Sequence, residues 1–178
     1  MTTLEEAWRW YECTARQFQL MQRLSHLYWT ELPWNLLERD DRFRSLERER
    51  LMDEAQFGLS HLEDLAVVVL FSVFESLVRR HILAEVREEA DMLSHRALKL
   101  AAQQMMEQIA EGSFFRVLQP FKDAHSDLIE EVNQVRRYRN WVAHGRGGVE
   151  PENVTPRLAY ERLQRFLHII LPEPPTAS

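Results

Sequence analysis

The sequence predicts an all-α protein, built as a single-domain helical bundle of five or more helices. Glycine is scarce, with 5 among 178 residues, and the prolines lie mostly near segment ends. Apolar residues recur every three or four positions over long stretches, as they do on helices. Because hydrophobic residues make up 45% of the chain, a core is expected, with one domain over residues 1–171.

The first helix is predicted over residues 4–30, ending before Pro33. Its apolar side chains have helical spacing and include Leu4, Trp8, Tyr11, Ala15 and Phe18. This helix is a candidate extension of the central domain. Residues 34–50 mix arginines with acids and are expected to form one or two short, exposed helices.

The central helix is expected to begin at Ser60, with Glu63 as its capping-box partner, and to continue to about Glu89. Residues 66–74 are apolar on nearly every side, which is typical of a helix surrounded by others. A further helix is expected to be capped by Ser94 or Asp91.

Two turn signals follow. The further helix should run through Ile109 and stop at Gly112, and Pro120 then interrupts the chain. Another helix is expected to begin at Ser126, and its end is predicted at a group of glycines, Gly145, Gly147 and Gly148.

The last helix has a strong start signal. Thr155 is a capping residue, and Pro156 follows it at the first helical position. Residues 172–178 contain three prolines and are expected to form a mobile tail.

Composition also restricts the function. A net charge of −6 argues against a broad basic surface for nucleic acid, although a small basic site remains compatible with it. A single cysteine, Cys13, excludes an internal disulfide and favours a reducing, cytoplasmic setting. The longest apolar run, 65–71, is too short to span a bilayer, so no membrane association is expected.

The most informative segment is 136–146, which holds four arginines, one asparagine and one histidine, and no acid. In a helical projection of residues 126–144, one narrow stripe is apolar and contains Leu128, Val132, Val135 and Val142. Arg139 falls inside that stripe. A guanidinium there must be paired or must face a cleft.

Arg139 and His144 are five residues apart, which places them roughly 140° apart around one ideal helix. They would therefore not meet easily within one chain. A second copy, related by a two-fold axis, could bring the two side chains to one substrate, so a homodimer is expected.

Residues 139–144, Arg-Asn-Trp-Val-Ala-His, resemble the signature of the HEPN superfamily (higher eukaryotes and prokaryotes nucleotide-binding domains). That signature is an arginine, four to six residues and a histidine, commonly with a polar residue directly after the arginine. Asn140 occupies this polar position. Phe74-Glu75 is also reminiscent of a helix in family members, and the all-helical layout extends the resemblance loosely over 60–171.

The resemblance implies a dimeric, metal-independent endoribonuclease that needs no cofactor and acts as a toxin, in phage defence or in RNA processing. The ribose 2′-hydroxyl would attack the neighbouring phosphorus, so RNA would be cleaved and DNA spared. His144 would act as the acid or base, and Arg139 and Asn140 would hold the phosphate. Glu75 is a candidate support for this site.

The resemblance also makes RNA the expected partner and an antitoxin or other protein a further one. Three neighbouring arginines would attract the strand: Arg136, Arg137 and Arg146.

Three alternatives remain. Arg139 could be a structural arginine paired with Glu75 or with another acid on a helix, and His144 could simply cap its helix. The fold could be a non-catalytic module that binds a nucleotide, RNA or a partner protein. The chain could also be a structural helical protein that uses its Trp-rich first helix for contact. The histidines show neither His-x-x-x-His nor Glu-x-x-His spacing, so a helical metal site is not expected.

Overall fold

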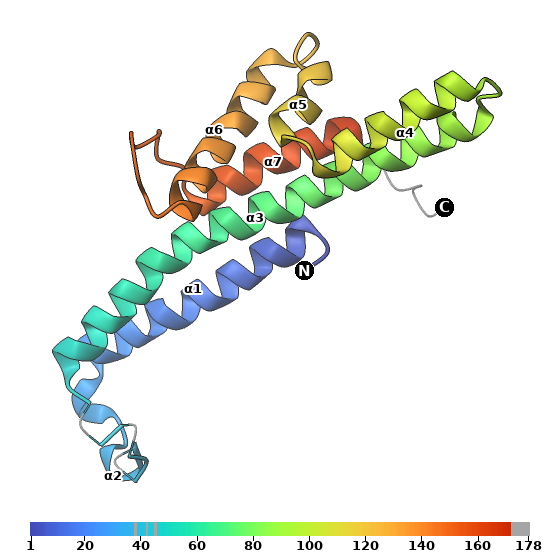
Figure 1. Cartoon of the computed structure of the whole chain (residues 1–178). Coiled ribbons are helices and arrows are strands. Elements are labelled where there is room, and N and C mark those ends of the chain that lie inside the picture. Colours follow the sequence, from blue (N-terminus) through green and yellow to red (C-terminus); the bar gives the residue numbers. More distant parts are fainter. Residues whose placement is uncertain (38, 42, 45, 172–178) are drawn as a thin grey trace, which may run out of the picture.

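A computed structural model describes residues 1–37, 39–41, 43–44 and 46–171 of the chain. These residues form seven α-helices and two short 3-10 helices, without a strand, so the predicted all-α class is confirmed. The helix α3 (Arg48–Met92) is the spine of the molecule, and the other long helices lie along it (Figure 1). Its 45 residues span about 68 Å. The expected mobile tail, 172–178, lies outside the described residues.

The helix α1 (Leu4–Leu27) begins with a capping box, in which the Thr3 hydroxyl accepts from the Glu6 amide and the Glu6 carboxylate accepts from the Thr3 amide. It lies beside the first half of α3 (Figure 1). Its first turns contribute Leu4 and Ala7 to the core. The helix ends at Leu27, before the predicted limit, and a 3-10 turn, η1 (Trp29–Glu31), follows.

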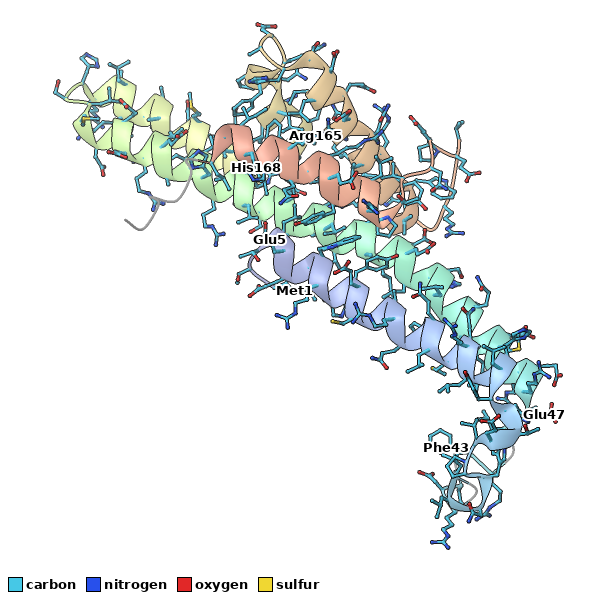
Figure 2. The ribbon with its side chains drawn as sticks, turned by 180° about the vertical axis from the view of Figure 1, so that it is seen from behind. Met1, Glu5, Phe43, Glu47, Arg165 and His168 are labelled. Carbon is cyan, nitrogen blue, oxygen red and sulfur yellow. The ribbon has the colours of Figure 1, made fainter. Side chains whose placement is uncertain are left out.

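Within the described part of 34–50, α2 (Trp34–Leu37) is the only short helix. The long helix α3 begins at Arg48, so residues 48–50 belong to that helix. Figure 2 shows Phe43 and Glu47 at the end of the molecule farthest from the core.

The predicted start of the central helix at Ser60 is wrong. Ser60 lies inside α3, and its hydroxyl donates to the Phe57 carbonyl at 2.9 Å. Serine can satisfy its hydroxyl in this way within a helix, so a capping residue type does not by itself mark a start. The extra turns pack on α1. At Gly58 a Cβ would come within 2.4 Å of the Phe18 ring, so this glycine allows the close approach.

The helix α4 (Arg96–Glu111) folds back along the second half of α3 (Figure 1). Its N-cap is His95, whose Nδ1 accepts from the Ala97 amide at 3.2 Å, so neither Ser94 nor Asp91 has the predicted role. A histidine nitrogen can replace a hydroxyl or carboxylate oxygen as the capping acceptor. Gly112 ends the helix as predicted.

Two short elements that were not predicted, α5 (Phe114–Leu118) and η2 (Gln119–Phe121), connect α4 to the last two helices. Pro120 lies inside η2. The helix α6 (Ser126–Ala143) starts at Ser126 as predicted, although its N-cap is His125.

The helix α7 (Pro156–Ile170) begins as predicted, since the Thr155 hydroxyl accepts from the Leu158 amide. It packs on α3, α6 and the first turns of α1, where Trp8 stacks on Tyr160 with ring centroids 5.0 Å apart. Figure 2 shows Glu5, in the first turn of α1, beside α3 and α7.

The core lies where the middle of α3 meets α1, α5, α6 and α7. Its largest buried rings contact one another edge to face at 5.6–5.8 Å, the geometry that aromatic pairs favour. These rings are Phe71, Phe74, Phe114 and Phe166. Because α3 and α6 both contribute to this core, the position of α6 on α3 is well determined.

The spine α3 also contains an 18-residue window with a mean hydropathy of 1.7, so by length and composition it could cross a membrane. The core helix of a soluble protein meets the same criterion. In this fold 39% of the window is buried, and it supplies Val67, Leu70, Phe71 and Phe74 to the protein core.

Candidate functional site

Arg139 lies at the edge of the buried face of α6. The buried residues of α6 are Ile129, Val132, Asn133, Val135 and Tyr138. The predicted stripe is therefore displaced, and Leu128 and Val142 are only half-buried. The helical projection considered aliphatic residues alone. Asn133 and Tyr138 can be buried because their polar atoms find partners, in Arg136 and Asp64.

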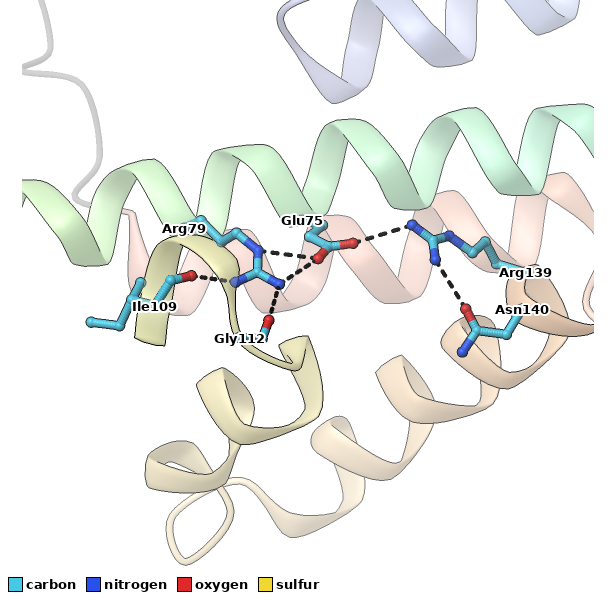
Figure 3. A network of polar contacts seen from close by, with 6 residues as sticks. All are labelled: Glu75, Arg79, Ile109, Gly112, Arg139 and Asn140. Carbon is cyan, nitrogen blue, oxygen red and sulfur yellow. Dashed lines mark hydrogen bonds and ion pairs between the residues drawn. The ribbon is translucent and has the colours of Figure 1, made fainter. Parts of the chain in front are cut away.

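Glu75 of α3 joins two arginines from different elements (Figure 3). One of its carboxylate oxygens accepts from Arg79, at 2.6 Å from Nη2 and 3.1 Å from Nε. The other oxygen accepts from Nη2 of Arg139 at 3.3 Å. Nη1 of Arg139 donates to the Asn140 amide oxygen at 2.9 Å. Two guanidinium groups share one carboxylate, so the cluster keeps one positive charge.

Arg79 has a second task that Arg139 lacks. Its guanidinium also donates to the carbonyls of Ile109 and Gly112, where α4 ends. Helix ends expose such unpaired carbonyls, and a cation there is stabilising. Only 15% of the Arg79 side chain is exposed, against 28% for Arg139. Arg139 is thus the more exposed arginine of the pair.

Arg139 also forms a cation–π contact with the aromatic core, since its guanidinium carbon lies 5.2 Å from the centroid of the Phe71 ring. Sequence reasoning missed Arg79. Its spacing of four residues from Glu75 on one helix was an available signal.

His144 lies at the C-cap of α6, and its amide donates to the Asn140 carbonyl at 2.9 Å. Its side chain is exposed. Among the residues that the structure describes, none pairs with the His144 imidazole through a hydrogen bond or an ion pair. The structure therefore joins Arg139, Asn140 and Glu75 and leaves His144 apart from them within one chain.

Arg146 fixes the turn after His144. Its φ of 59° and the φ of 75° at Gly145 are left-handed, and the Arg146 amide donates to the Trp141 carbonyl at 2.8 Å. The Arg146 guanidinium forms an ion pair with Asp64 of α3 and lies 5.3 Å from the centroid of the Trp141 ring. Arg146 is therefore engaged by the protein itself.

Asp64 is buried and also accepts a 2.8 Å hydrogen bond from the Tyr138 hydroxyl. Burial, together with this bond to the Asp64 carboxylate, raises the pKa of Tyr138 to about 12. Sequence reasoning missed both residues. Two adjacent acids, Glu63 and Asp64, lie in the otherwise apolar stretch 62–71, and neighbouring residues on a helix point in different directions. That was the signal for Asp64, since an acid facing the core needs a partner.

The other two arginines of the motif also have partners. Arg136 donates to Asn133 at 3.0 Å and lies over the Phe115 ring. Burial, followed by the nearby guanidinium groups of Arg137 and Arg139, lowers the pKa of Arg136. Arg137 pairs with the exposed Glu130 at 2.6 Å.

In comparisons with known proteins, no family model, no curated protein and no solved structure matches this chain. In the described part of the chain, no three His, Cys, Asp or Glu side chains gather where they could hold a metal ion. The candidate site thus consists of guanidinium, amide, carboxylate and imidazole groups.

Proposed function

We propose that the chain is a metal-independent endoribonuclease of HEPN type, located in the cytoplasm and active as a homodimer. The observation that carries this proposal is the unequal sharing of Glu75. Arg79 holds the carboxylate through two contacts, and Arg139 holds it through one contact of 3.3 Å. Arg139 is therefore positioned by the protein and still has N–H groups available for a phosphate.

The proposed reaction uses groups that the chain itself supplies. The ribose 2′-hydroxyl attacks the adjacent phosphorus, and the bond to the 5′-oxygen breaks. Arg139 stabilises the charge that develops on the phosphate oxygens, and Asn140 orients the guanidinium through their 2.9 Å hydrogen bond. The products are a 2′,3′-cyclic phosphate and a free 5′-hydroxyl.

His144 supplies the proton chemistry, by removing the 2′-proton or by protonating the leaving oxygen. Because no contact joins it to Arg139 in one chain, we propose that His144 acts on a phosphate bound by Arg139 of the second copy. The exposed position of His144 at the end of α6 is compatible with such a contact.

An antitoxin or other regulatory protein is a further expected partner, and a toxin, phage-defence or RNA-processing role fits this activity. Of the arginines that could attract RNA, Arg137 has the weakest internal engagement, since it pairs only with an exposed acid. Arg136 and Arg146 are engaged within the protein, so their effect on RNA should be indirect.

The test is incubation of RNA with purified protein in EDTA, in parallel with the variants Arg139→Ala and His144→Ala. Loss of an acid or base group lowers the rate by about 10²–10⁴, and a comparable loss is expected without Arg139. Product ends are identified by mass spectrometry as a cyclic phosphate and a 5′-hydroxyl. Equal activity of all three proteins would refute the proposal.

A second candidate is a non-catalytic module on the same fold. The separation of Arg139 from His144 favours it, since an anion could bind at Arg139 with no acid or base beside it. This function predicts that RNA or a nucleotide raises the melting temperature without turnover, and that Arg139→Ala abolishes this shift.

A further inference from the structure

An open hollow lies on α3 directly beside the Glu75 cluster, with a volume of about 610 Å³. Glu75 and Arg79 belong to both, and Figure 3 shows Glu75 between Arg79 and Arg139. Arg139 does not line the hollow itself and is joined to it through the ion pair with Glu75. The polar side chains that line it are Ser72, Glu75, Ser76, Arg79, Arg80 and Arg87.

The exposed lining residues follow one face of α3. Ser72, Ser76 and Arg80 are spaced by four residues, and Arg87 follows seven residues later. From Ser72 to Arg87 this face extends about 22 Å along the helix axis. Serines lie at one end, where the Ser72 hydroxyl donates to the Val68 carbonyl at 2.8 Å, and long cationic side chains occupy the other end.

The charge of this surface is opposite to that of the whole protein. Arg79, Arg80 and Arg87 line the hollow, Arg139 adjoins it, and Glu75 is the only acid in its lining. The chain as a whole carries a net charge of −6. A local basic surface on an acidic protein concentrates an anionic ligand at that place.

We propose that this face of α3 is a track for the phosphate backbone of the RNA strand next to the cleaved bond, with Arg80 and Arg87 as its phosphate ligands. This inference rests on the proposed ribonuclease function. Guanidinium and serine hydroxyl groups are common donors to phosphate oxygens, and such contacts position a strand without reading its sequence. Arg139 receives the reacting phosphate, and the track holds its neighbours.

The alternative path, along α6, has fewer available groups. Arg146 is paired with Asp64, Arg136 lies over Phe115, and Arg137 pairs with Glu130. The strand therefore leaves Arg139 over α3.

The binding test uses single-stranded polyadenosine RNA and a His144→Ala background, which prevents cleavage during the measurement. The track variant carries Arg80→Gln and Arg87→Gln. The control carries Arg9→Gln and Arg16→Gln, two exposed arginines of α1 with the same spacing of seven. Each lost phosphate contact on a single strand reduces the slope of log affinity against log salt by about 0.7, so the track variant should lose about 1.4.

The same contacts predict an affinity roughly 25-fold lower at 0.1 M salt for the track variant, with the control close to the parent protein. Equal slopes and affinities in the track variant and its control would overturn the inference. Polyglutamate is the second ligand. If it binds as tightly as RNA and its affinity falls by the same factor in the track variant, the surface is a site for an acidic protein, and the inference is also wrong.

A cleavage test separates this inference from the proposed function. With His144 intact, the track variant should raise KM for long RNA and leave cleavage of a dinucleoside monophosphate unchanged, because that substrate does not reach Arg80. An equal loss on both substrates would overturn the track. If His144→Ala cleaves as well as wild type, the ribonuclease proposal fails, while the salt slopes still decide whether the track binds RNA.

Discussion

The single carboxylate of Glu75 positions two arginines, Arg79 and Arg139. Both ion pairs are strengthened by the partial burial of Glu75. Its side chain is 21% exposed, so its ion pairs are less screened than those at an open surface. It keeps Arg79 on the end of α4 and keeps Arg139 oriented toward solvent. The Arg139–Glu75 pair that the sequence offered as a structural alternative is present. It is compatible with a functional Arg139, because the paired side chain remains partly exposed.

Replacing this carboxylate tests that division of roles. Glu75→Gln leaves two half-buried guanidinium groups without their counter-charge, which should cost about 2 kcal/mol of unfolding free energy. Urea denaturation measures the loss. Affinity for RNA should stay the same or rise, because a negative charge has been removed from a phosphate site. A loss of both stability and RNA affinity would indicate that Glu75 positions Arg139 more than it neutralises it.

Tyr138 makes stability depend on pH in the alkaline range. Its pKa is raised from 10.0 to about 12 in the folded protein, so folding favours the neutral phenol. This contribution to stability is fully present below pH 10.0 and is lost as the pH rises through about 12.

Tyr138→Phe should therefore weaken the fall in stability between those two pH values, and below them it should cost about 1 kcal/mol for the lost hydrogen bond to Asp64. Thermal unfolding across the alkaline range gives both quantities. Tyr28→Phe is the control, because the Tyr28 side chain is exposed and is not bonded to Asp64. Identical alkaline profiles for wild type and Tyr138→Phe would contradict the assignment.

At the scale of elements, the end of α6 determines where His144 lies. The helix stops because Gly145 and Arg146 both adopt left-handed backbone angles, and the Arg146–Asp64 ion pair ties this turn to α3. Glycine is the residue that adopts such angles without steric cost. The position of His144 thus depends on the residue after it.

Gly145→Ala should reduce stability by about 1 kcal/mol, because alanine is strained at the φ of 75°. Gly147→Ala is a matched control, since Gly147 is not among the residues with positive φ and a Cβ there meets nothing closer than 3.9 Å. RNA cleavage should fall in the first variant and not in the second. Equal melting temperatures of both variants would show that the turn adapts.

At the scale of the whole molecule, α6 and α1 lie on different sides of α3 (Figure 1), and the Glu75–Arg139 ion pair joins α6 to the part of α3 that lines the hollow. Residues 139–140 and 72–87 can therefore act on one strand. The third member of the motif, His144, is not in contact with Arg139, and a two-fold axis is the simplest arrangement that supplies it.

Mixing two inactive variants tests this arrangement. If Arg139 of one copy acts with His144 of the other, a heterodimer of Arg139→Ala and His144→Ala contains one intact site. Half of the dimers in an equal mixture are heterodimers, so roughly a quarter of wild-type activity should return. Sedimentation must first establish the dimer. No recovery by a mixture of confirmed dimers would place both residues of a site in one chain.

The sequence by itself determined the helical class, the starts at Ser126 and Thr155 and the stop at Gly112, because such signals act within one or two turns of chain. It also singled out 139–144. Local signals failed at Ser60, whose hydroxyl donates within α3, and at Asp91 and Ser94, because His95 caps α4 instead. The short α5 was missed because five residues hold too little periodicity.

Only the tertiary structure decided which charges meet. Arg139 pairs with Glu75 across 64 positions of sequence and Arg146 with Asp64 across 82. Such pairs depend on how α6 is set against α3, which the packing of Val132, Val135 and Tyr138 in the core determines. The same packing places Arg139 on Glu75, which lines one hollow with Arg80 and Arg87. No spacing along the chain encodes that arrangement, because it results from two helices meeting at one core.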